Sequence, residues 1–276
     1  MPHSKNHEQK EMWDGSLGEG FLKSQEYIDR IVTPFSDTAI KKANPNSNDK
    51  ILDVGCGAGS TSIQLAISGA EVKGVDISDK MISRAKKESE GIPNIAFQTV
   101  DASQASFDER FTKIFSRFGV MFFSDPVEAF TNLHKSLDQK GKLTFLCWQA
   151  ITKNEWIYVS AEALQAFQPK DIEPPDPKAP GGFAFADGDY IKEILESANY
   201  SDIAIEALET KFDLGKSLEE IMSFNMNVGP LAGLVGTMEE EIVQEATESL
   251  KRTLGMKMGK DGLHLSAAAW LVTASA

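Results

Sequence analysis

Short apolar segments alternate with amphipathic ones along this chain, and the alternation predicts an α/β fold. The apolar segments are brief and rich in β-branched and aromatic residues, as buried strands are. Between them, apolar residues recur at helical spacing. We therefore expect strands at about 51–54, 71–77, 95–100, 111–118, 142–148, 202–208 and 264–274. Helices are expected at about 23–43, 60–66, 79–89, 126–137, 154–167, 189–198, 217–226 and 238–254.

A glycine-rich turn directly follows the first predicted strand. Gly55, Gly57 and Gly59 alternate with Cys56 and Ala58. Glycines at this spacing let the backbone turn tightly and approach a ligand without interference from a Cβ atom. The hydroxyl residues at 60–62 open the next helix and can cap it. We therefore expect a polar ligand above the turn.

Two classes of nucleotide ligand compete for such a turn. The dinucleotide fingerprint G-x-G-x-x-G would require a third glycine where Ser60 stands, so a nucleotide-dependent oxidoreductase is disfavoured. From Asp53 to Gly59 the spacing is acidic-x-G-x-G-x-G. Here the chain resembles the class I S-adenosylmethionine-dependent methyltransferases, whose first motif has this form. The resemblance covers about 49–148 and the closing strand, and it implies S-adenosylmethionine as cofactor. A glycine turn that only packs a helix on a sheet is the alternative.

An acidic residue ends the second predicted strand. Asp76 follows the turn by about twenty residues, where nucleotide-binding α/β folds place a carboxylate that accepts hydrogen bonds from both ribose hydroxyls. Ile77 and Met81 flank it and are expected to cover the adenine. The alternative role for Asp76 is a helix cap, for which Ser78 and Asp79 are better placed.

The resemblance assigns roles at the ends of the next two strands. Asp101 and Ala102 lie where family members contact the adenine edge, an acidic side chain meeting the exocyclic amine and a backbone amide meeting a ring nitrogen. A turn-forming role for Asp101 is the alternative. Ser116 and Arg117 lie where the fourth strand reaches the methionyl part of the cofactor. Arg117 can pair with the methionyl carboxylate or a substrate carbonyl, or form a structural ion pair.

The remaining segments are expected to form a cover. Residues 1–48 are interpreted as an N-terminal helical cap segment, disordered over 1–10, whose helix either closes over the cofactor or only covers core surface. Residues 49–276 form the methyltransferase domain, with insertions at about 150–185 and 213–258 that are rich in Phe, Met and Trp. We interpret these insertions as a substrate lid above the strand ends. A homodimer interface is the alternative.

Charge and composition narrow the function classes. The formal net charge of −13 argues against a nucleic-acid or anionic-membrane partner. No run reaches the roughly 20 apolar residues of a spanning helix, and 1–10 has no apolar secretory core, so a cytoplasmic protein is expected. Cys56 and Cys147 are expected to be buried thiols. The four histidines lack ligand spacing, so no metal is expected.

The sequence therefore predicts a Rossmann-like, seven-stranded, mostly parallel sheet with an antiparallel last strand and helical lid insertions. The expected function is methyl transfer from S-adenosylmethionine to an oxygen or nitrogen of a small, apolar or aromatic metabolite. This reaction needs alignment and a dry pocket more than a nucleophilic side chain, so no catalytic residue is assigned. His264 is expected near the core in a structural role. A carbon methyltransferase of quinone type and a non-catalytic S-adenosylmethionine-binding protein are the alternatives.

Overall fold

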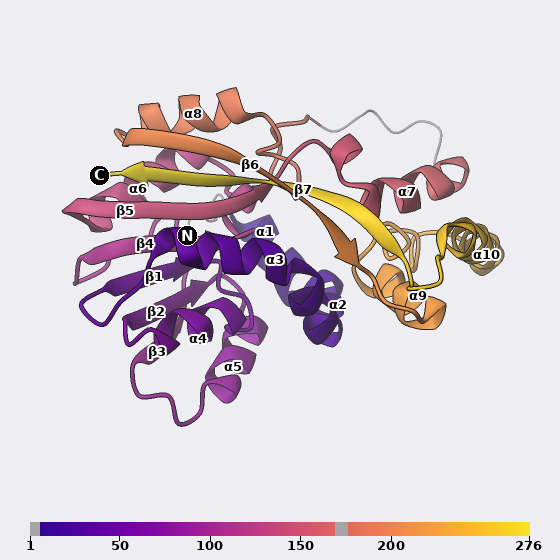
Figure 1. Ribbon diagram of the computed structural model, residues 1–276, viewed down its shortest axis with the longest axis horizontal. Coiled ribbons are helices and arrows are strands. Elements are labelled where there is room, and N and C mark those ends of the chain that lie inside the picture. The colour runs from indigo at the N-terminus through magenta and orange to yellow at the C-terminus, as the bar shows by residue number, and fades with distance from the viewer. Residues whose placement is uncertain (1–5, 169–175) are drawn as a thin grey trace.

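The computed structural model describes residues 6–168 and 176–276, which form a seven-stranded sheet with helices packed on it (Figure 1). The strand order is β3-β2-β1-β4-β5-β7-β6. β7 runs antiparallel to both of its neighbours, and the other paired strands are parallel. This confirms the predicted fold class, including the antiparallel last strand. The strands are β1 (Lys50–Val54), β2 (Glu71–Asp76), β3 (Ile95–Thr99), β4 (Phe111–Arg117), β5 (Leu137–Trp148), β6 (Ser201–Asp213) and β7 (His264–Ser275).

Helices pack on the sheet and gather beyond the carboxyl ends of its central strands (Figure 1). The packed helices are α3 (Gln25–Ala43), α4 (Ser60–Ile67), α5 (Asp79–Glu88), α6 (Pro126–Ser136) and α8 (Gly188–Ser197), with α3 beside α4 and α6 beside α8. Beyond the strand ends lie α1 (His7–Asp14), α2 (Ser16–Lys23), α7 (Glu155–Leu164), α9 (Leu218–Asn227) and α10 (Glu240–Lys257). Short 3₁₀ turns occupy Val120–Phe122, Ile151–Lys153 and Gln165–Phe167.

Local capping explains where several helices begin. The Ser78 hydroxyl accepts a hydrogen bond from the Met81 N–H at the start of α5, as expected. Asp125 caps α6 in the same way, and proline occupies its first position. α4 departs from the prediction, because its N-cap is Gly59 in a left-handed conformation and no side chain caps it. The hydroxyls at the start of α4 are therefore available for other contacts.

The long strands differ most from their predicted bounds. β5 begins at Leu137 and not at 142, so residues 138–141 belong to the strand, with an irregular register against β4. β6 continues to Asp213 because it pairs with β7 along its whole length. His264 is exposed at the start of β7, 3.7 Å from an Asp213 carboxylate oxygen, so its predicted place near the core is wrong.

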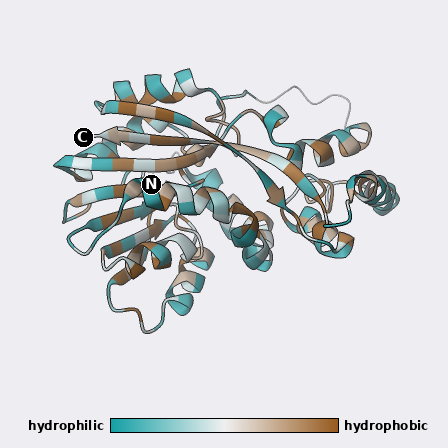
Figure 2. Ribbon diagram, in the orientation of Figure 1, coloured by the Kyte–Doolittle hydropathy of each residue, from teal (hydrophilic) through white to brown (hydrophobic). Residues whose placement is uncertain are grey.

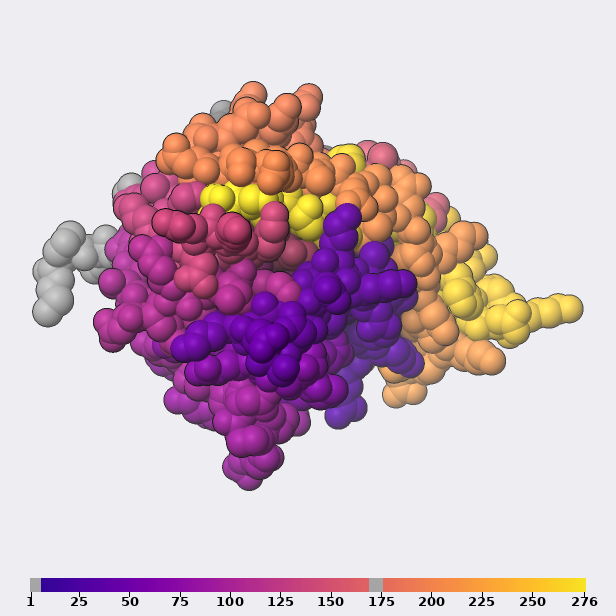
Figure 3. All heavy atoms as spheres, turned by 60° about the vertical axis from the view of Figure 1, so that its left-hand side comes forward, coloured from indigo at the N-terminus to yellow at the C-terminus, as the bar shows by residue number. Residues whose placement is uncertain are grey.

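The N-terminal segment is more ordered than the sequence suggested. Residues 7–10, predicted to be disordered, belong to α1. α2 contacts α9, and α3 contacts β5 and β6, so this segment lies against the C-terminal half of the chain (Figure 3). Residues 1–5 of the predicted disordered stretch, and 169–175 of the first predicted insertion, lie outside the described residues.

Apolar side chains concentrate in the strands, whereas α10 is largely hydrophilic (Figure 2). Phe111, Phe115 and Phe145 are among the largest fully buried side chains. Cys56 and Cys147 are free, buried thiols, as predicted. Across residues 6–168 and 176–276, no helix has the length and apolar character needed to cross a bilayer, and no cluster of potential metal ligands occurs.

Candidate functional site

A cavity of about 330 Å³ opens beside the glycine turn, where β1, β2 and β4 end. Its volume lies within the range of roughly 300–1,000 Å³ that is usual for small-molecule sites. The N-terminal segment and both predicted insertions contribute to its wall. Most of the predicted site residues line it together: Asp53, Gly55, Cys56, Gly57, Asp76, Ile77, Met81, Asp101, Ala102 and Arg117.

The three turn glycines serve different purposes. All have positive φ angles, which glycine adopts without steric cost. A Cβ atom on Gly55 would lie 2.8 Å from Gly119 Cα, so this glycine allows β1 and β4 to meet. A Cβ on Gly59 would press on Phe97, so Gly59 serves helix packing and does not line the cavity as predicted. A Cβ on Gly57 would meet nothing within 4 Å, and this turn therefore has open space above it.

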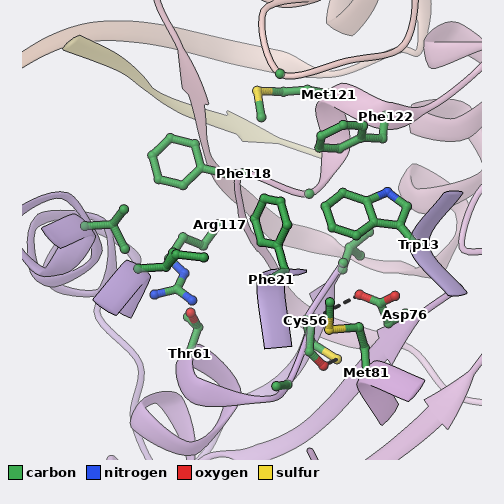
Figure 4. A pocket seen from close by; sticks show the side chains of 18 of the residues that line it. Trp13, Phe21, Cys56, Thr61, Asp76, Met81, Arg117, Phe118, Met121 and Phe122 are labelled. Atoms are coloured by element: carbon green, nitrogen blue, oxygen red, sulfur yellow. Dashed lines mark hydrogen bonds between the residues drawn. The ribbon is translucent and has the colours of Figure 1, made fainter. Parts of the chain in front are cut away.

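Asp76 is held by the backbone at the rim of the turn. Its Oδ2 accepts the Gly57 N–H and its Oδ1 accepts the Ser78 N–H, both at 2.9 Å. Burial raises the pKa of Asp76, while these two hydrogen bonds oppose the shift. Each carboxylate oxygen has a further lone pair, so the fixed side chain can still accept hydroxyl donors from the cavity. Met81 and Cys56 lie beside it (Figure 4).

Asp101 lies beside Asp76, at the end of the neighbouring strand and under the start of α1, since the Val100 N–H donates to the Asp76 carbonyl oxygen. Both of its carboxylate oxygens lie 3.0 Å from the Asn6 amide nitrogen, which also donates to the Ser103 hydroxyl. The Ser103 N–H donates to Asp101 Oδ1 as well. Asp101 therefore stabilises the turn after β3, which was the alternative role considered for it, and it also lines the cavity.

Asp53 is buried beneath the glycine turn with 1% of its surface exposed. Its Oδ2 accepts the Ser62 hydroxyl, whereas no hydrogen-bond donor within the described parts of the chain reaches Oδ1. Burial raises the pKa of Asp53 to about 7, although Ser62 and the Arg117 charge oppose the shift. A buried carboxylate oxygen without a donor favours a cationic or N–H group in the cavity.

The two residues predicted on β4 have different environments. The Ser116 hydroxyl is buried and donates to the Val54 carbonyl oxygen at 2.7 Å, so Ser116 does not face the cavity as predicted. Strand alternation places these two neighbouring side chains on opposite faces of the sheet, and Arg117 lies on the face of the cavity. Arg117 Nη2 forms an ion pair with Asp29 Oδ1 at 2.8 Å. The structural ion pair considered for Arg117 therefore exists, and Arg117 also lines the cavity.

The other end of the cavity is aromatic. Phe118 stacks on Trp148, with ring centroids 4.0 Å apart, and Trp156 and Phe212 pack around Trp148. Phe224 of α9 packs against Trp156 and completes this wall. We call this group the aromatic chamber: Phe118, Trp148, Trp156, Phe212 and Phe224. A flat apolar molecule fits such walls, because aromatic faces contribute large contact area.

Several residues that line the cavity were not predicted from the sequence. Gln25 and Asp29 of α3 and Thr61 of α4 line the cavity between the glycine turn and Arg117. Trp13 and Phe21 of the N-terminal helices lie over its middle (Figure 4). No sequence motif distinguishes a Gln or Thr that faces a cavity from one that faces water.

Comparison with known proteins agrees with this geometry. A family model described as a methyltransferase domain matches residues 51–141. The aklanonic acid methyltransferase DauC of a Streptomyces species is 30% identical over 137 residues, which are 46% of this chain and 62% of that protein. The matched region, residues 51–141, is a methyltransferase domain of the class I S-adenosylmethionine-dependent type.

Further relatives share the family or the fold. The malonyl-[acyl-carrier protein] O-methyltransferase 1 of Ilyobacter polytropus is 28% identical over 122 residues, 44% of this chain and 44% of that protein. The matches thus span less than two thirds of both curated relatives. The YcgJ protein of Bacillus subtilis has the same fold, with a TM-score of 0.57 at 16% identity, over 87% of this chain and 97% of that one.

The residues present fit the cofactor of this family, S-adenosylmethionine. Asp76 presents a fixed carboxylate suited to ribose hydroxyls. The open space above Gly57 admits a ligand close to the backbone. Asp53 Oδ1 is a buried acceptor to which no described residue donates, and it suits an amino group. Polar groups at one end and aromatic groups at the other match a ligand with a nucleoside, a charged tail and an apolar acceptor beside it.

Proposed function

We propose that this chain transfers a methyl group from S-adenosylmethionine to an oxygen or nitrogen of a small, flat, apolar or aromatic molecule. The observation that carries the proposal is a continuous cavity that joins the glycine turn to the aromatic chamber. A cofactor held at the turn would therefore have its activated methyl group close to an acceptor in the chamber. A site that bound only the cofactor would not need the aromatic chamber.

S-adenosylmethionine supplies a methyl group on a positively charged sulfur. The chain's own residues align the two reactants and exclude water. Asp76 and Asp101 would hold the nucleoside, and Ile77 and Met81 would cover its base. The aromatic chamber would orient the acceptor, and its apolar walls would strengthen charge attraction between the acceptor atom and the sulfur.

The cover over this cavity is formed by parts of the chain that lie outside the matched region. In this proposal, residues 1–48 are the cap segment and the insertions at about 150–185 and 213–258 are the lid. Support comes from the lining residues Trp13 and Phe21 of the cap, and Trp156, Phe183 and Phe224 of the insertions. Their aromatic character suits a substrate cover, although it also suits the dimer interface considered above.

Transfer to oxygen is favoured over transfer to carbon by the name of one relative. The Ilyobacter protein is an O-methyltransferase by its name, and 122 of its residues match this chain. The class of acceptor is inferred from the aromatic chamber. Carbon transfer and cofactor binding without transfer are the competing outcomes of the test.

The test combines cofactor binding with methyl transfer. Calorimetry should detect binding of S-adenosylhomocysteine. The purified protein is then incubated with methyl-labelled S-adenosylmethionine and a panel of hydroxy- and amino-substituted naphthalenes and quinones. Label should move to an oxygen or nitrogen, as read by mass spectrometry and NMR. Label on carbon would contradict the atom assignment, and binding without transfer to the panel or to a cell extract would favour the non-catalytic alternative.

A further inference from the structure

The N-terminal segment holds the second insertion through contacts made outside the cavity. α2 contacts α9, the first helix of that insertion, and two side chains of α3 reach the same helix (Figure 1). The three residues that make these contacts, Gly20, Tyr27 and Arg30, are not among those that line the cavity. Phe224 of α9, in contrast, belongs to the aromatic chamber. The contacts therefore act on the cavity wall from behind it.

Tyr27 is at the centre of these contacts. Its ring stacks on Phe224, with ring centroids 4.9 Å apart and ring planes 25° from parallel. Its hydroxyl donates to the Leu214 carbonyl oxygen at 2.9 Å. Tyr27 is buried, and burial raises the pKa of its phenol, so the hydroxyl keeps its proton and remains a donor at neutral pH. Since Leu214 directly follows β6, one side chain holds both the start of the second insertion and its contribution to the chamber.

Two further contacts hold the two ends of α9. The Arg30 guanidinium pairs with Glu220 in the first turn of α9 at 3.0 Å, and it lies over the Tyr27 ring. At the other end, a Cβ atom on Gly20 would lie 2.0 Å from the carbonyl oxygen of Asn227, the last residue of α9. Exposed ion pairs contribute little, so the buried stack and this close backbone contact are the stronger restraints. α9 therefore cannot shift away from α2 and α3 without losing the stack on Tyr27.

The position of α9 fixes one wall of the aromatic chamber. Phe224 packs against Trp156, and Val228 lines the cavity just beyond the end of the helix. α3 contributes Ile28 and Ile31 to the cavity wall as well. One helix of the N-terminal segment thus lines the cavity itself and also holds the helix that supplies Phe224. The width available to a flat molecule depends on this pairing of α3 with α9.

We propose that Tyr27 is a positioning residue for the methyl acceptor, because it holds Phe224 in the wall of the aromatic chamber. The proposal rests on the proposed function, since it takes the chamber as the acceptor site. It goes further by giving the N-terminal segment a role in acceptor binding, besides the cover over the cofactor. When Phe224 leaves the wall for part of the time, acceptor affinity falls in proportion to the fraction of molecules with a complete wall.

Binding of 2-naphthol, measured by calorimetry with S-adenosylhomocysteine at saturation, tests the proposal. Tyr27→Leu removes both the stack and the hydrogen bond, so 2-naphthol affinity should fall by roughly tenfold. Tyr27→Phe keeps the stack and should retain most of the affinity, with a loss of roughly two- to fivefold. Affinity for S-adenosylhomocysteine should change less than twofold in both variants. Tyr158→Phe is the matched control, because Tyr158 is exposed and does not line the cavity, and it should alter neither affinity.

Gly20→Ala displaces α9 from outside the cavity and leaves Tyr27 in place. The added methyl group would meet the Asn227 backbone, so α2 and α9 must separate. The KM for an aromatic acceptor should rise several-fold while kcat at saturating acceptor stays close to wild type. A loss of overall stability would instead lower the active fraction, and hence kcat, without raising KM. Gly255→Ala in α10 is the matched control, because its nearest atom would lie 3.7 Å away in ordinary contact.

Hydrogen exchange supplies a readout that needs no ligand. Exchange over α9 should be faster in Tyr27→Leu than in wild type, while β6 and β7 change little. Equal losses of affinity for both ligands, wild-type affinity in every variant, or unchanged exchange over α9 would overturn the positioning role and leave the proposed function intact. Failure of the wild type to bind S-adenosylhomocysteine or 2-naphthol would instead count against the cofactor or the chamber assigned in the proposed function.

Discussion

Phe118 and Trp148 stack face to face, with ring centroids 4.0 Å apart and ring planes 8° from parallel. Phe118 reaches this position from a left-handed backbone conformation, with φ at 60°. Such a conformation costs a bulky L-residue about 1–2 kcal/mol. The next residue, Gly119, packs against Gly55, where a Cβ atom on Gly119 would lie 2.9 Å from Gly55 Cα. The strain therefore places an aromatic ring on the wall of the aromatic chamber.

This relationship predicts different outcomes for two substitutions of Phe118. Phe118→Ala and Phe118→Gly both remove the ring, so both should raise the KM for an aromatic acceptor and leave S-adenosylhomocysteine affinity unchanged. Phe118→Gly should unfold at the higher temperature, because glycine adopts a positive φ without strain. Thermal unfolding compares the pair directly. Equal unfolding temperatures would show that the backbone of Phe118 is not strained.

Cofactor binding should depend on Asp76. Asp76→Ala removes the acceptor proposed for two ribose hydroxyls, and hydrogen bonds to a charged group contribute about 1.5–3 kcal/mol each. Affinity for S-adenosylhomocysteine should fall by roughly tenfold or more in calorimetry. Asp79→Ala is the control, because Asp79 is exposed and pairs with Lys10. Wild-type affinity in Asp76→Ala would contradict the ribose assignment.

Gly57 should tolerate no side chain once ligand is bound. Gly57→Val should abolish S-adenosylhomocysteine binding with only a modest loss of stability, because the added atoms enter open space at a positive φ. Gly55→Ala is the useful comparison, since its Cβ would meet the Gly119 backbone and should destabilise the fold itself. Circular dichroism and calorimetry separate the two effects. An unfolded Gly57→Val variant would indicate a packing role for that glycine.

Asp53 should link stability to pH. Its pKa rises from 3.8 to about 7 on folding, so the folded state favours the protonated form. The stabilisation is fully present below 3.8 and is lost as pH rises towards about 7. Asp53→Asn should therefore gain stability relative to wild type between about pH 5 and about pH 8, by on the order of a few kcal/mol.

The same substitution should have the opposite effect on ligand affinity. Asp53→Asn should weaken binding of S-adenosylhomocysteine at neutral pH, because the amide cannot supply the charge proposed for the amino group. In wild type, affinity should decline as pH falls below about 7, since Asp53 then takes up a proton. Chemical denaturation and calorimetry across pH measure both trends. Identical pH profiles for the two proteins would remove Asp53 from this role.

Two nearby phenylalanines of the first insertion should behave differently. Phe183 lines the cavity, so Phe183→Ala should weaken acceptor binding and leave cofactor binding unchanged. Phe185 is 2% exposed and packs against Phe130 and Phe145, so it is a core residue and not the lid contact the sequence suggested. Phe185→Ala should lower the free energy of unfolding by about 3–5 kcal/mol.

The lid itself has a separate readout. Hydrogen exchange over the described parts of 150–185 and over 213–258 should slow when S-adenosylhomocysteine and an acceptor bind, while the sheet changes little. Unchanged exchange in both insertions, together with a silent Phe183→Ala, would favour an oligomer contact or plain surface.

The strands were predictable because their signals are local. The glycine turn, the carboxylate ending β2 and the cap of α5 depend on neighbours in sequence, and they appear as expected. α1 and α2 were missed because their burial comes from distant segments, such as the contact of α2 with α9.

Site residues were likewise predictable where a local sequence motif marks them. Asp53 and Asp76 belong to sequence motifs, whereas Gln25 and Thr61 gain meaning only from the absence of a hydrogen-bond partner in the folded, described chain. Arg117 lines the cavity and the Ser116 hydroxyl bonds the Val54 carbonyl oxygen, because neighbouring residues of a strand lie on opposite faces of the sheet and the sequence does not say which face is which.

The second insertion leaves and rejoins the sheet at a single place. Asp213 pairs with His264, and the Leu214 and Leu263 N–H groups donate across the junction to Leu263 and Gly215 carbonyl oxygens. Residues between 216 and 262 are therefore an excursion from one β-hairpin, closed at its base by backbone hydrogen bonds. Another segment can replace this one between β6 and β7 without altering the register of the sheet. Such an exchange would replace Phe224 in the wall of the aromatic chamber and leave Phe118, Trp148 and the glycine turn in place.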